Sequence, residues 1–426
     1  MDTPGTYRPR VVDVAIDALL RTMGAVLIEG PKWCGKTWTG LRHARSVVWV
    51  ADPADNYLTR RIAHSDPASL LNGDKPLLLD EWQDAPGLWD AVRSSVDASG
   101  GAAGHYLLTG SATPRDTATS HSGTGRIARV RMWPMSLWES GLSDGSVSLG
   151  ELLDGQPPRV ARGSMTEAAM IEAILVGGWP GSLARPAADV LGVPRAYLES
   201  VAASDASRLD GARRDPVRLG AVIASLARNT ATLVSTRTIA QDTAAGGEAV
   251  ASTKTVADYL DVLRRLHILQ EIPAWSPALR SPVRLRQSPK RLLVDPSLAA
   301  AGLVATAPAL RADRKTLGLL FETLCLRDLS VYAPTANARV SYYHDDAGLE
   351  ADAILHSDDG RWSGVEIKWG PGQEDAAAAS LLRLKTKMTL RGERPPAALV
   401  VIVGPGGFAH RRDDGVDVVP IDCLRP

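Results

Sequence analysis

The sequence predicts an α/β protein whose first part, residues 1 to about 140, folds as a doubly wound parallel sheet. Two observations lead to this fold class. Short apolar runs alternate with helical patterns, as consecutive βαβ units require. A glycine-rich stretch, Gly30 to Thr37, also lies between an apolar run and a helical pattern. Strand, loop and helix in this order are the setting of a phosphate-binding loop.

Five strands are expected in this part of the chain. They are placed near Ala25 to Glu29, Val47 to Ala51, Leu77 to Asp80, His105 to Thr109 and Ala128 to Met132. The run Leu77-Leu78-Leu79 is apolar throughout, which is typical of a parallel strand that is buried on both faces. The stretch Thr113 to Gly125, rich in Thr, Ser and Gly, is expected to be a mobile loop near the bound phosphates.

The glycine-rich stretch predicts the binding of a nucleoside triphosphate. Its terminal glycines let successive backbone N–H groups close around phosphate oxygens, while Lys36 supplies a cation and the Thr37 hydroxyl can ligate Mg²⁺. The alternative is a glycine-rich surface turn. The residues expected at the nucleotide are Gly30, Pro31, Lys32, Trp33, Cys34, Gly35, Lys36, Thr37, Trp38, Thr109 and Ser111.

Two carboxylates follow the third expected strand. Asp80 is expected to reach the metal ion, and Glu81 to polarise the attacking water. The hydroxyls of Thr109 and Ser111 end a neighbouring strand and are candidate sensors of the γ-phosphate or the water. The alternative for these two hydroxyls is that they only satisfy the backbone of a turn.

These motifs resemble the AAA-type ATPases (AAA+ superfamily) of bacteria and archaea that carry a C-terminal domain of unknown function. The matching segments are Tyr7-Arg8-Pro9-Arg10, the loop itself, Leu79-Asp80-Glu81-Trp82-Gln83 with Pro86, Leu107 to Ser111, Gly125-Arg126, Pro134 to Leu137, and Gly177-Gly178-Trp179-Pro180. The resemblance implies ATP and Mg²⁺ as ligands and a possible homo-oligomer. It also makes Arg126 a candidate contact to the γ-phosphate, in cis or from a neighbouring subunit, with Arg129 and Arg131 as competitors.

The loop departs from that family at one place. Trp33-Cys34 stands where small or polar residues are more usual, although neither side chain is needed for binding. Cys34 is expected to make the site sensitive to thiol reagents if it is exposed.

Composition limits the other function classes. The chain has 426 residues, 45% of them hydrophobic, and three scattered cysteines, which indicate neither zinc nor a disulfide framework. Its 48 basic and 48 acidic residues cancel, so any binding of nucleic acid must be local. Because no apolar run approaches the roughly 20 residues of a membrane span, we expect a soluble, cytoplasmic protein without a membrane partner.

The middle of the chain is expected to hold a linker with a helical lid, residues 141–227, and then a winged-helix-like domain, residues 228–305. Val256, Tyr259, Leu260, Leu263 and Leu266 recur at helical spacing and predict a core-facing stripe. The acid-free span Ser276 to Val294 contains five basic residues: Arg280, Arg284, Arg286, Lys290 and Arg291. This basic ribbon is expected to follow a DNA backbone. The alternatives are a solvated hairpin and a surface for a protein partner.

The last part, residues 306–426, resembles the PD-(D/E)xK fold of restriction endonucleases. The order is a helix with Glu322, a strand near Val340, a strand with Asp352, and a strand with Glu366 and Lys368. In that fold Asp352 and Glu366 would hold Mg²⁺, with Glu322 in support, and Lys368 would orient a water molecule. Glu-x-Lys is short and ordinary on exposed strands, so a catalytically silent fold is the alternative.

Together these features predict an ATP-hydrolysing AAA-type protein whose C-terminal half binds DNA and is a candidate nuclease. The alternative function is a nucleotide-dependent regulatory switch whose silent nuclease-like domain binds a protein partner.

Overall fold

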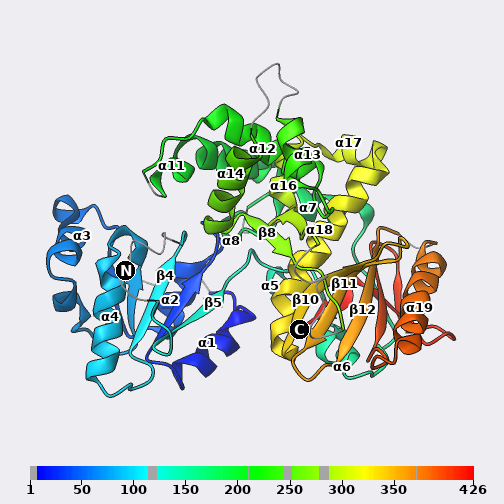
Figure 1. The fold of residues 1–426 in the computed structure, drawn as a ribbon, viewed down its shortest axis with the longest axis horizontal. Helices are drawn as coiled ribbons and strands as arrows, with labels where there is room; N and C mark the ends of the chain where they lie inside the picture. Colours follow the sequence, from blue (N-terminus) through cyan, green and yellow to red (C-terminus); the bar gives the residue numbers. More distant parts are fainter. Residues whose placement is uncertain are drawn as a thin grey trace. The chain divides into compact units, whose positions relative to one another are not determined.

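The computed structural model describes residues 7–113, 122–183, 185–209, 211–243, 252–277, 287–370 and 372–426 (Figure 1). The chain divides into two compact units. The N-terminal unit comprises Met1–Pro134, Ala203–Arg214 and Asp261–Ile268, and the C-terminal unit comprises Met135–Ala202, Asp215–Leu260 and Leu269–Pro426.

The N-terminal unit is built on a five-stranded parallel sheet with the strand order β2-β3-β4-β1-β5. The strands are β1 (Ala25–Glu29), β2 (Ser46–Trp49), β3 (Leu77–Asp80), β4 (Tyr106–Gly110) and β5 (Ile127–Arg131). Each overlaps its expected range, so the parallel sheet predicted for this region is confirmed. Because all strands run in one direction, the ends of β1, β3, β4 and β5 meet at the same edge of the sheet.

Helices cover both faces of this sheet, as its apolar strands require. The helices are α1 (Val12–Leu20), α2 (Lys36–His43), α3 (Ala54–Ser65) and α4 (Gly87–Ala98). Leu88, Trp89 and Val92 of α4 pack with Leu27 and Leu79 on one face. On the other face, Ile16 of α1 packs in a separate cluster with Val26, Ile28, Leu78 and Leu107.

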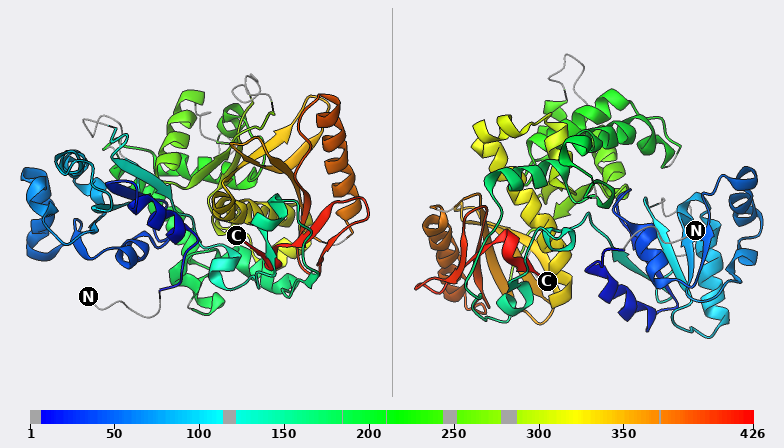
Figure 2. Two further views of the ribbon diagram at one scale, coloured as in Figure 1. Left: turned by 90° about the horizontal axis from the view of Figure 1, so that it is seen from below. Right: turned by 180° about the vertical axis from the view of Figure 1, so that it is seen from behind.

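The C-terminal unit contains a seven-stranded mixed sheet with the order β10-β11-β12-β13-β15-β14-β7 (Figure 2). Its strands are β7 (Ala161–Arg162), β10 (Ala338–His344), β11 (Glu350–Ser357), β12 (Trp362–Lys368), β13 (Leu399–Val403), β14 (Phe408–Arg411) and β15 (Asp417–Pro420). The pairs β10·β11 and β11·β12 are antiparallel, whereas β12·β13 and β13·β15 are parallel. Helices α18 (Arg314–Tyr332) and α19 (Glu374–Leu390) flank this sheet, as Figures 1 and 2 show.

The rest of this unit is mainly helical. Its helices include α5 (Leu137–Ser140), α7 (Glu167–Val176), α8 (Pro180–Leu183), α9 (Ala187–Val190), α10 (Val193–Ser200), α12 (Pro216–Arg228), α13 (Thr236–Asp242), α16 (Pro296–Gly302) and α17 (Ala307–Ala312). Helix α14 (Thr253–Arg265) precedes the antiparallel hairpin of β8 (Leu269–Ile272) and β9 (Lys290–Leu293). All five members of the expected apolar stripe of α14 are buried. Within the described ranges, no helix combines the length and the apolar character that a membrane crossing requires.

Residues 141–163, the first part of the region expected to be a linker with a helical lid, contain secondary structure that joins the C-terminal sheet region. Strand β6 (Val147–Ser148) pairs with β16 (Leu424–Arg425), α6 (Leu149–Leu153) follows it, and β7 pairs with β14. Glycine and proline in this segment therefore mark turns between short elements, which composition alone cannot distinguish from a linker.

A buried ionic cluster holds the C-terminal unit together. Arg327 of α18, 2% exposed at its side chain, pairs with Asp295 at 2.9 Å and with Asp328 at 2.7 Å. The two carboxylates also accept backbone N–H groups, Asp328 from Leu137 and Asp295 from Gly178. These bonds satisfy each buried charge, which is the condition for tolerating it.

Candidate functional site

The glycine-rich loop has the shape of a phosphate cradle. Gly35 precedes α2 with φ = 102°, a left-handed conformation that favours glycine. Gly30 is needed for space, because a Cβ there would lie 2.2 Å from the carbonyl oxygen of Met132. Lys36 is buried, and its Nζ donates to the carbonyl of Pro31 at 2.8 Å. Its ammonium group therefore lies inside the loop, beside the N-terminus of α2.

Residues before the first strand brace this loop, a role that the sequence did not reveal. Arg10 donates to the carbonyls of Cys34 at 2.7 Å and Trp133 at 2.8 Å. The Tyr7 hydroxyl lies 3.1 Å from Thr39 Oγ1. The matching segment Tyr7 to Arg10 was the only sequence signal for this contact. Cys34 is fully buried, so the condition for thiol sensitivity is not met.

Asp80 lies at the end of β3, within the same carboxyl edge of the sheet. Its Oδ1 accepts a hydrogen bond from Thr109 Oγ1 at 2.7 Å, and Thr37 also hydrogen-bonds the carboxylate. Burial, helped by the charge of Glu81, raises the pKa of Asp80 against the opposing bonds from Thr109 and Thr37. The carboxylate and the Thr37 hydroxyl are thus adjacent, and both are ligand types that Mg²⁺ accepts.

Glu81 has an unusual backbone and a held side chain. Its φ of 57° is left-handed, and its N–H donates to Thr109 Oγ1 at 3.0 Å. Ser111 Oγ donates to Glu81 Oε2 at 2.9 Å, and the Gln83 amide donates to the same oxygen. Gln83 is a partner that the sequence pattern did not single out. Thr109 and Ser111 therefore bind the two acids directly in this structure.

The arginine candidates lie at different ends of β5. Arg126 precedes the strand, its carbonyl accepts from Ala25 at the start of β1, and its side chain pairs with Asp97 at 2.7 Å. That is the edge opposite the phosphate loop, so the expected contact of Arg126 in cis is wrong. Contact from a neighbouring subunit stays a prediction. Arg129 pairs with Glu29 at 3.3 Å.

Arg131 ends β5 opposite Glu29, directly before the loop begins on β1. Burial lowers its pKa to about 10, which leaves the guanidinium charged at neutral pH. Its Nε and Nη2 are buried without a hydrogen-bond partner among the described residues. Arg131 is therefore the arginine of the three that this edge of the sheet favours for a contact in cis.

Two later segments also belong to the N-terminal unit and contribute residues near the loop. Lys32 of the loop pairs with Asp205 at 2.7 Å. Burial, together with the charges of Arg131 and Lys36, lowers the pKa of His267 to about 3, so this imidazole is neutral. Neither contact had a signal in the sequence, because both join positions that are far apart along the chain.

A carboxylate and lysine cluster forms in the C-terminal unit, from Glu322 on α18, Asp352 on β11, Glu366 and Lys368 on β12, and Lys290 on β9. Lys368 Nζ lies 2.6 Å from Glu366 Oε2 and 3.3 Å from Asp352 Oδ2. Lys290 Nζ lies 2.6 Å from Glu322 Oε1 and 4.0 Å from Asp352 Oδ1. The four predicted residues are thus brought together, and Lys290 joins them.

The charges of this carboxylate and lysine cluster are strongly interdependent. Burial and the charge of Asp352 raise the pKa of Glu322 to about 7 and that of Glu366 to about 8. Despite its burial, Asp352 has a lowered pKa because Lys290 and Lys368 lie on either side of it. Although burial opposes it, the neighbouring carboxylates raise the pKa of Lys290 and of Lys368, so both ammonium groups stay charged.

Part of the expected basic ribbon is not available to a ligand. Lys290 is buried in the cluster, and Arg291 is buried against Glu271 at 3.0 Å and the carbonyl of Val234. Their assignment to a DNA-tracking surface is therefore wrong, because both cations satisfy internal acceptors. The other three members, Arg280, Arg284 and Arg286, lie outside the described residues.

Comparisons with known proteins divide the chain into three parts. A family model described as "AAA domain" matches residues 22–140. Two models described as domains of unknown function, DUF8612 and DUF4143, match residues 167–309 and 317–424. No curated protein matches the chain. A solved structure, the Walker-type ATPase PABY2304 of Pyrococcus abyssi, is 12% identical and covers 70% of this chain and 99% of its own, with a TM-score of 0.42. At this TM-score and identity, the structural similarity supports no inference about this chain.

The match to the AAA domain agrees with the observed positions of the phosphate loop, Asp80 and Glu81. Residues 22–140 are similar to an AAA domain and have the parallel sheet and loop of a P-loop ATPase fold, and this region is called the ATPase domain below. In this ATPase domain the residues for phosphate, metal and water lie on one edge of a single sheet, as nucleotide sites of parallel sheets do. An AAA domain implies a bound nucleotide and typically Mg²⁺, for which Thr37 and Asp80 offer suitable oxygens.

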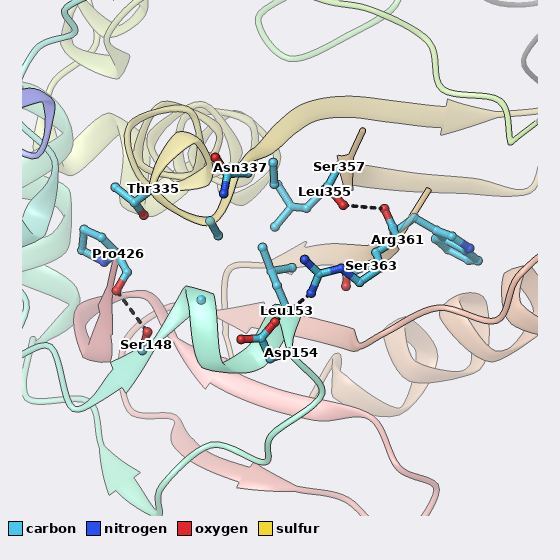
Figure 3. Close-up of a pocket in the computed structure, with 14 residues that line it drawn as sticks. Ser148, Leu153, Asp154, Thr335, Asn337, Leu355, Ser357, Arg361, Ser363 and Pro426 are labelled. Atoms are coloured by element: carbon cyan, nitrogen blue, oxygen red, sulfur yellow. Dashed lines mark hydrogen bonds and ion pairs between the residues drawn. The ribbon is translucent and has the colours of Figure 1, made fainter. Parts of the chain in front are cut away.

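Two cavities lie in the C-terminal unit away from the carboxylate and lysine cluster. One, of 440 Å³, is an open pocket lined by residues of α6, β11, β12, the segment 335–338 and the last residue of the chain (Figure 3). An ion pair between Arg361 and Asp154 at 2.8 Å crosses its wall. The second, of 760 Å³, is lined by Arg162, Arg314 and Trp369, and Trp369 directly follows Lys368.

Proposed function

We propose that this protein binds and hydrolyses ATP with Mg²⁺ at the loop of the ATPase domain. The observation that carries the proposal is that Asp80 and Glu81, at the end of β3, lie beside Thr37 and Lys36, at the N-terminus of α2. Lys36 would bind the outer phosphates, Thr37 and Asp80 would hold the metal, and Glu81 would orient the attacking water. The hydrogen bonds from Ser111 and Gln83 would hold Glu81 aside until nucleotide binding rearranges them.

Two variants separate binding from hydrolysis. Lys36→Ala should lose most ATP affinity, because it removes the buried cation of the loop. Glu81→Gln keeps the size and hydrogen-bonding capacity of the side chain, and should still bind ATP while hydrolysing it at least about 100-fold more slowly. Binding is measured with a fluorescent ATP analogue and hydrolysis by phosphate release. Hydrolysis by Glu81→Gln at the wild-type rate would remove the role assigned to this residue.

For the C-terminal half, we infer that it binds DNA and that the ATPase cycle controls this binding. Helices α12, α13 and α14 followed by the hairpin β8–β9 have the order of a winged helix, a frequent DNA-binding unit. The elements α18, β10, β11, β12, α19 and β13 follow the order of a restriction-endonuclease core. The cavity beside Trp369 is lined by one aromatic ring and two arginines, residue types that suit nucleotides, although Arg314 is paired with Glu167 of the same lining.

The DNA proposal is tested with Arg284 and Arg286, which precede β9. Changing both to Ala should weaken binding of a DNA duplex and flatten its salt dependence by about one unit of slope per lost phosphate contact. Arg311→Ala, on the exposed side of α17, is the matched control for a lost surface charge. An unchanged salt slope in the double variant would favour the second candidate, a nucleotide-dependent switch that binds a protein partner.

Cleavage of DNA is not part of this proposal. A divalent ion in the carboxylate and lysine cluster would need several free oxygen ligands. Among the described residues, no group of three or more His, Cys, Asp or Glu side chains is arranged to hold a metal ion. The residues present therefore do not fit the metal that the nuclease-like order of elements implies.

A further inference from the structure

Two cations lie against the acids of the expected metal site. Lys368, the lysine expected in this fold, contacts Glu366 and Asp352, and the further member Lys290 contacts Glu322 and Asp352. Lys290 Nζ is 2.6 Å from Glu322 Oε1, 3.1 Å from the backbone carbonyl of Asp352 and 4.0 Å from Asp352 Oδ1. Its side chain is 9% exposed. The ammonium group thus faces oxygens of both residues, the helix residue Glu322 and the strand residue Asp352.

An ammonium group and a divalent cation compete for such a position. Both need oxygen atoms from negatively charged groups, and a metal ion would bind them at about 2.0–2.6 Å. A metal ion held between Glu322 and Asp352 would lie within about 4 Å of Lys290 Nζ. At that separation the repulsion is large even at the dielectric constant of a protein surface.

Lys290 does not belong to the sheet that carries the acids. It begins β9, which pairs with β8 from Lys290 opposite Ile272 to Leu293 opposite Leu269. The next residue, Arg291, is fixed to Glu271 of β8. The position of the hairpin β8–β9 therefore decides whether the cation lies in the cluster.

We propose that Lys290 is an internal cation that takes the place of a divalent metal ion between Glu322 and Asp352. The hairpin β8–β9 holds this cation in the cluster, where it excludes Mg²⁺ and Mn²⁺. The inference concerns the cluster alone and does not depend on ATP hydrolysis, so it can fail while the ATPase proposal stands, and the reverse.

The test measures Mn²⁺ binding to the full chain, with the concentration of free Mn²⁺ determined by electron paramagnetic resonance. All proteins carry Asp80→Asn, which removes the metal carboxylate of the ATPase domain. With Lys290 present, no Mn²⁺ should bind at the cluster. Lys290→Met should bind one equivalent, with an affinity at least about tenfold above any residual binding by the protein that retains Lys290, since the substitution removes the repulsion and roughly keeps the length of the side chain. Lys290→Arg, which retains the charge, should gain nothing.

Two controls decide the remaining cases. Adding Asp352→Asn to Lys290→Met should abolish the new site, which assigns it to the cluster. If Lys290→Met is folded by circular dichroism and gains no Mn²⁺, the proposal is overturned. It is also overturned if the protein that retains Lys290 binds one Mn²⁺ that Asp352→Asn removes, and this measurement decides the matter even if Lys290→Met fails to fold.

Discussion

Thr109 provides the sharpest test of how the ATPase site is held. Its hydroxyl donates to Asp80 Oδ1 at 2.7 Å and accepts from the Glu81 N–H at 3.0 Å, and the residue is fully buried. Replacing it by Val keeps the shape and removes both bonds. One of these bonds ends on a carboxylate, and such bonds contribute about 1.5–3 kcal/mol.

We therefore expect Thr109→Val to lower the free energy of unfolding by about 1.5–3 kcal/mol. The Mg²⁺ concentration for half-maximal ATP hydrolysis should rise by about 10- to 100-fold, the usual cost of losing a partner that orients a metal ligand. The assay is phosphate release over a Mg²⁺ titration at saturating ATP, with urea unfolding of the same proteins.

Thr109→Ser is the matched control, because it retains the hydroxyl and loses only a methyl group. It should keep the Mg²⁺ dependence of the wild type. Val and Ser variants with the same Mg²⁺ dependence would refute the view that this hydroxyl positions Asp80, and would return Thr109 to the alternative of a residue that satisfies the backbone of a turn.

Four further substitutions test the charges of the protein, the last of them as a control. Asp80→Asn should raise the Tm of the nucleotide-free protein by about 2–4 °C, the shift for about 1 kcal/mol. Because folding raises the pKa of Asp80, its ionised form costs stability above that pKa, so the gain should vanish near pH 4 and an equal gain there would contradict the reasoning. Although burial opposes it, bonds from Asp13 and Asp17 raise the pKa of His43. That stabilisation is complete below the unfolded pKa of about 6.5 and is lost as the pH rises through the folded pKa. His43→Gln should thus destabilise the protein by about 1 kcal/mol at pH 6 and by less at pH 8.5 in urea unfolding, and a pH-independent loss would exclude the ion pairs as its cause. Arg327→Met should cost about 3–5 kcal/mol, because it leaves two buried carboxylates without their cation. Arg314→Met breaks an exposed pair with Glu167 and should cost about 0–1 kcal/mol, and equal losses would show that burial is not the deciding factor.

Local patterns predicted much of the ATPase domain. The loop from Gly30 to Thr37 and the run ending in Asp80 are contiguous, and each residue's role follows from its place on a strand or helix end. The prediction that Arg126 contacts the γ-phosphate in cis failed, because the position of Arg126 depends on where β5 begins. That start is set by the pairing of β5 with β1. A shift of five residues along this strand separates the amino edge from the edge with the nucleotide site.

The carboxylate and lysine cluster contains a contact that local sequence patterns could not predict. Glu322, Asp352, Glu366 and Lys368 were found through the order of helix and strands, which local patterns indicate. Lys290 was assigned to a basic ribbon that follows a DNA backbone, because its neighbours in the sequence are basic and no acid lies nearby along the chain. Its partners lie on α18 and β11, and only the tertiary fold reveals that they neutralise it.

The buried cluster around Arg327 bears on how this chain can be divided for expression. The two matched regions of unknown function end and begin at residues 309 and 317, which suggests a cut between them. Such a cut separates Asp295 from Arg327, and leaves a guanidinium group in an apolar interior with one of its two carboxylates missing. Sequence families and folding units do not coincide here. A C-terminal fragment that starts at Met135 would keep the N–H donors of Leu137 and Gly178 and both carboxylates in one polypeptide.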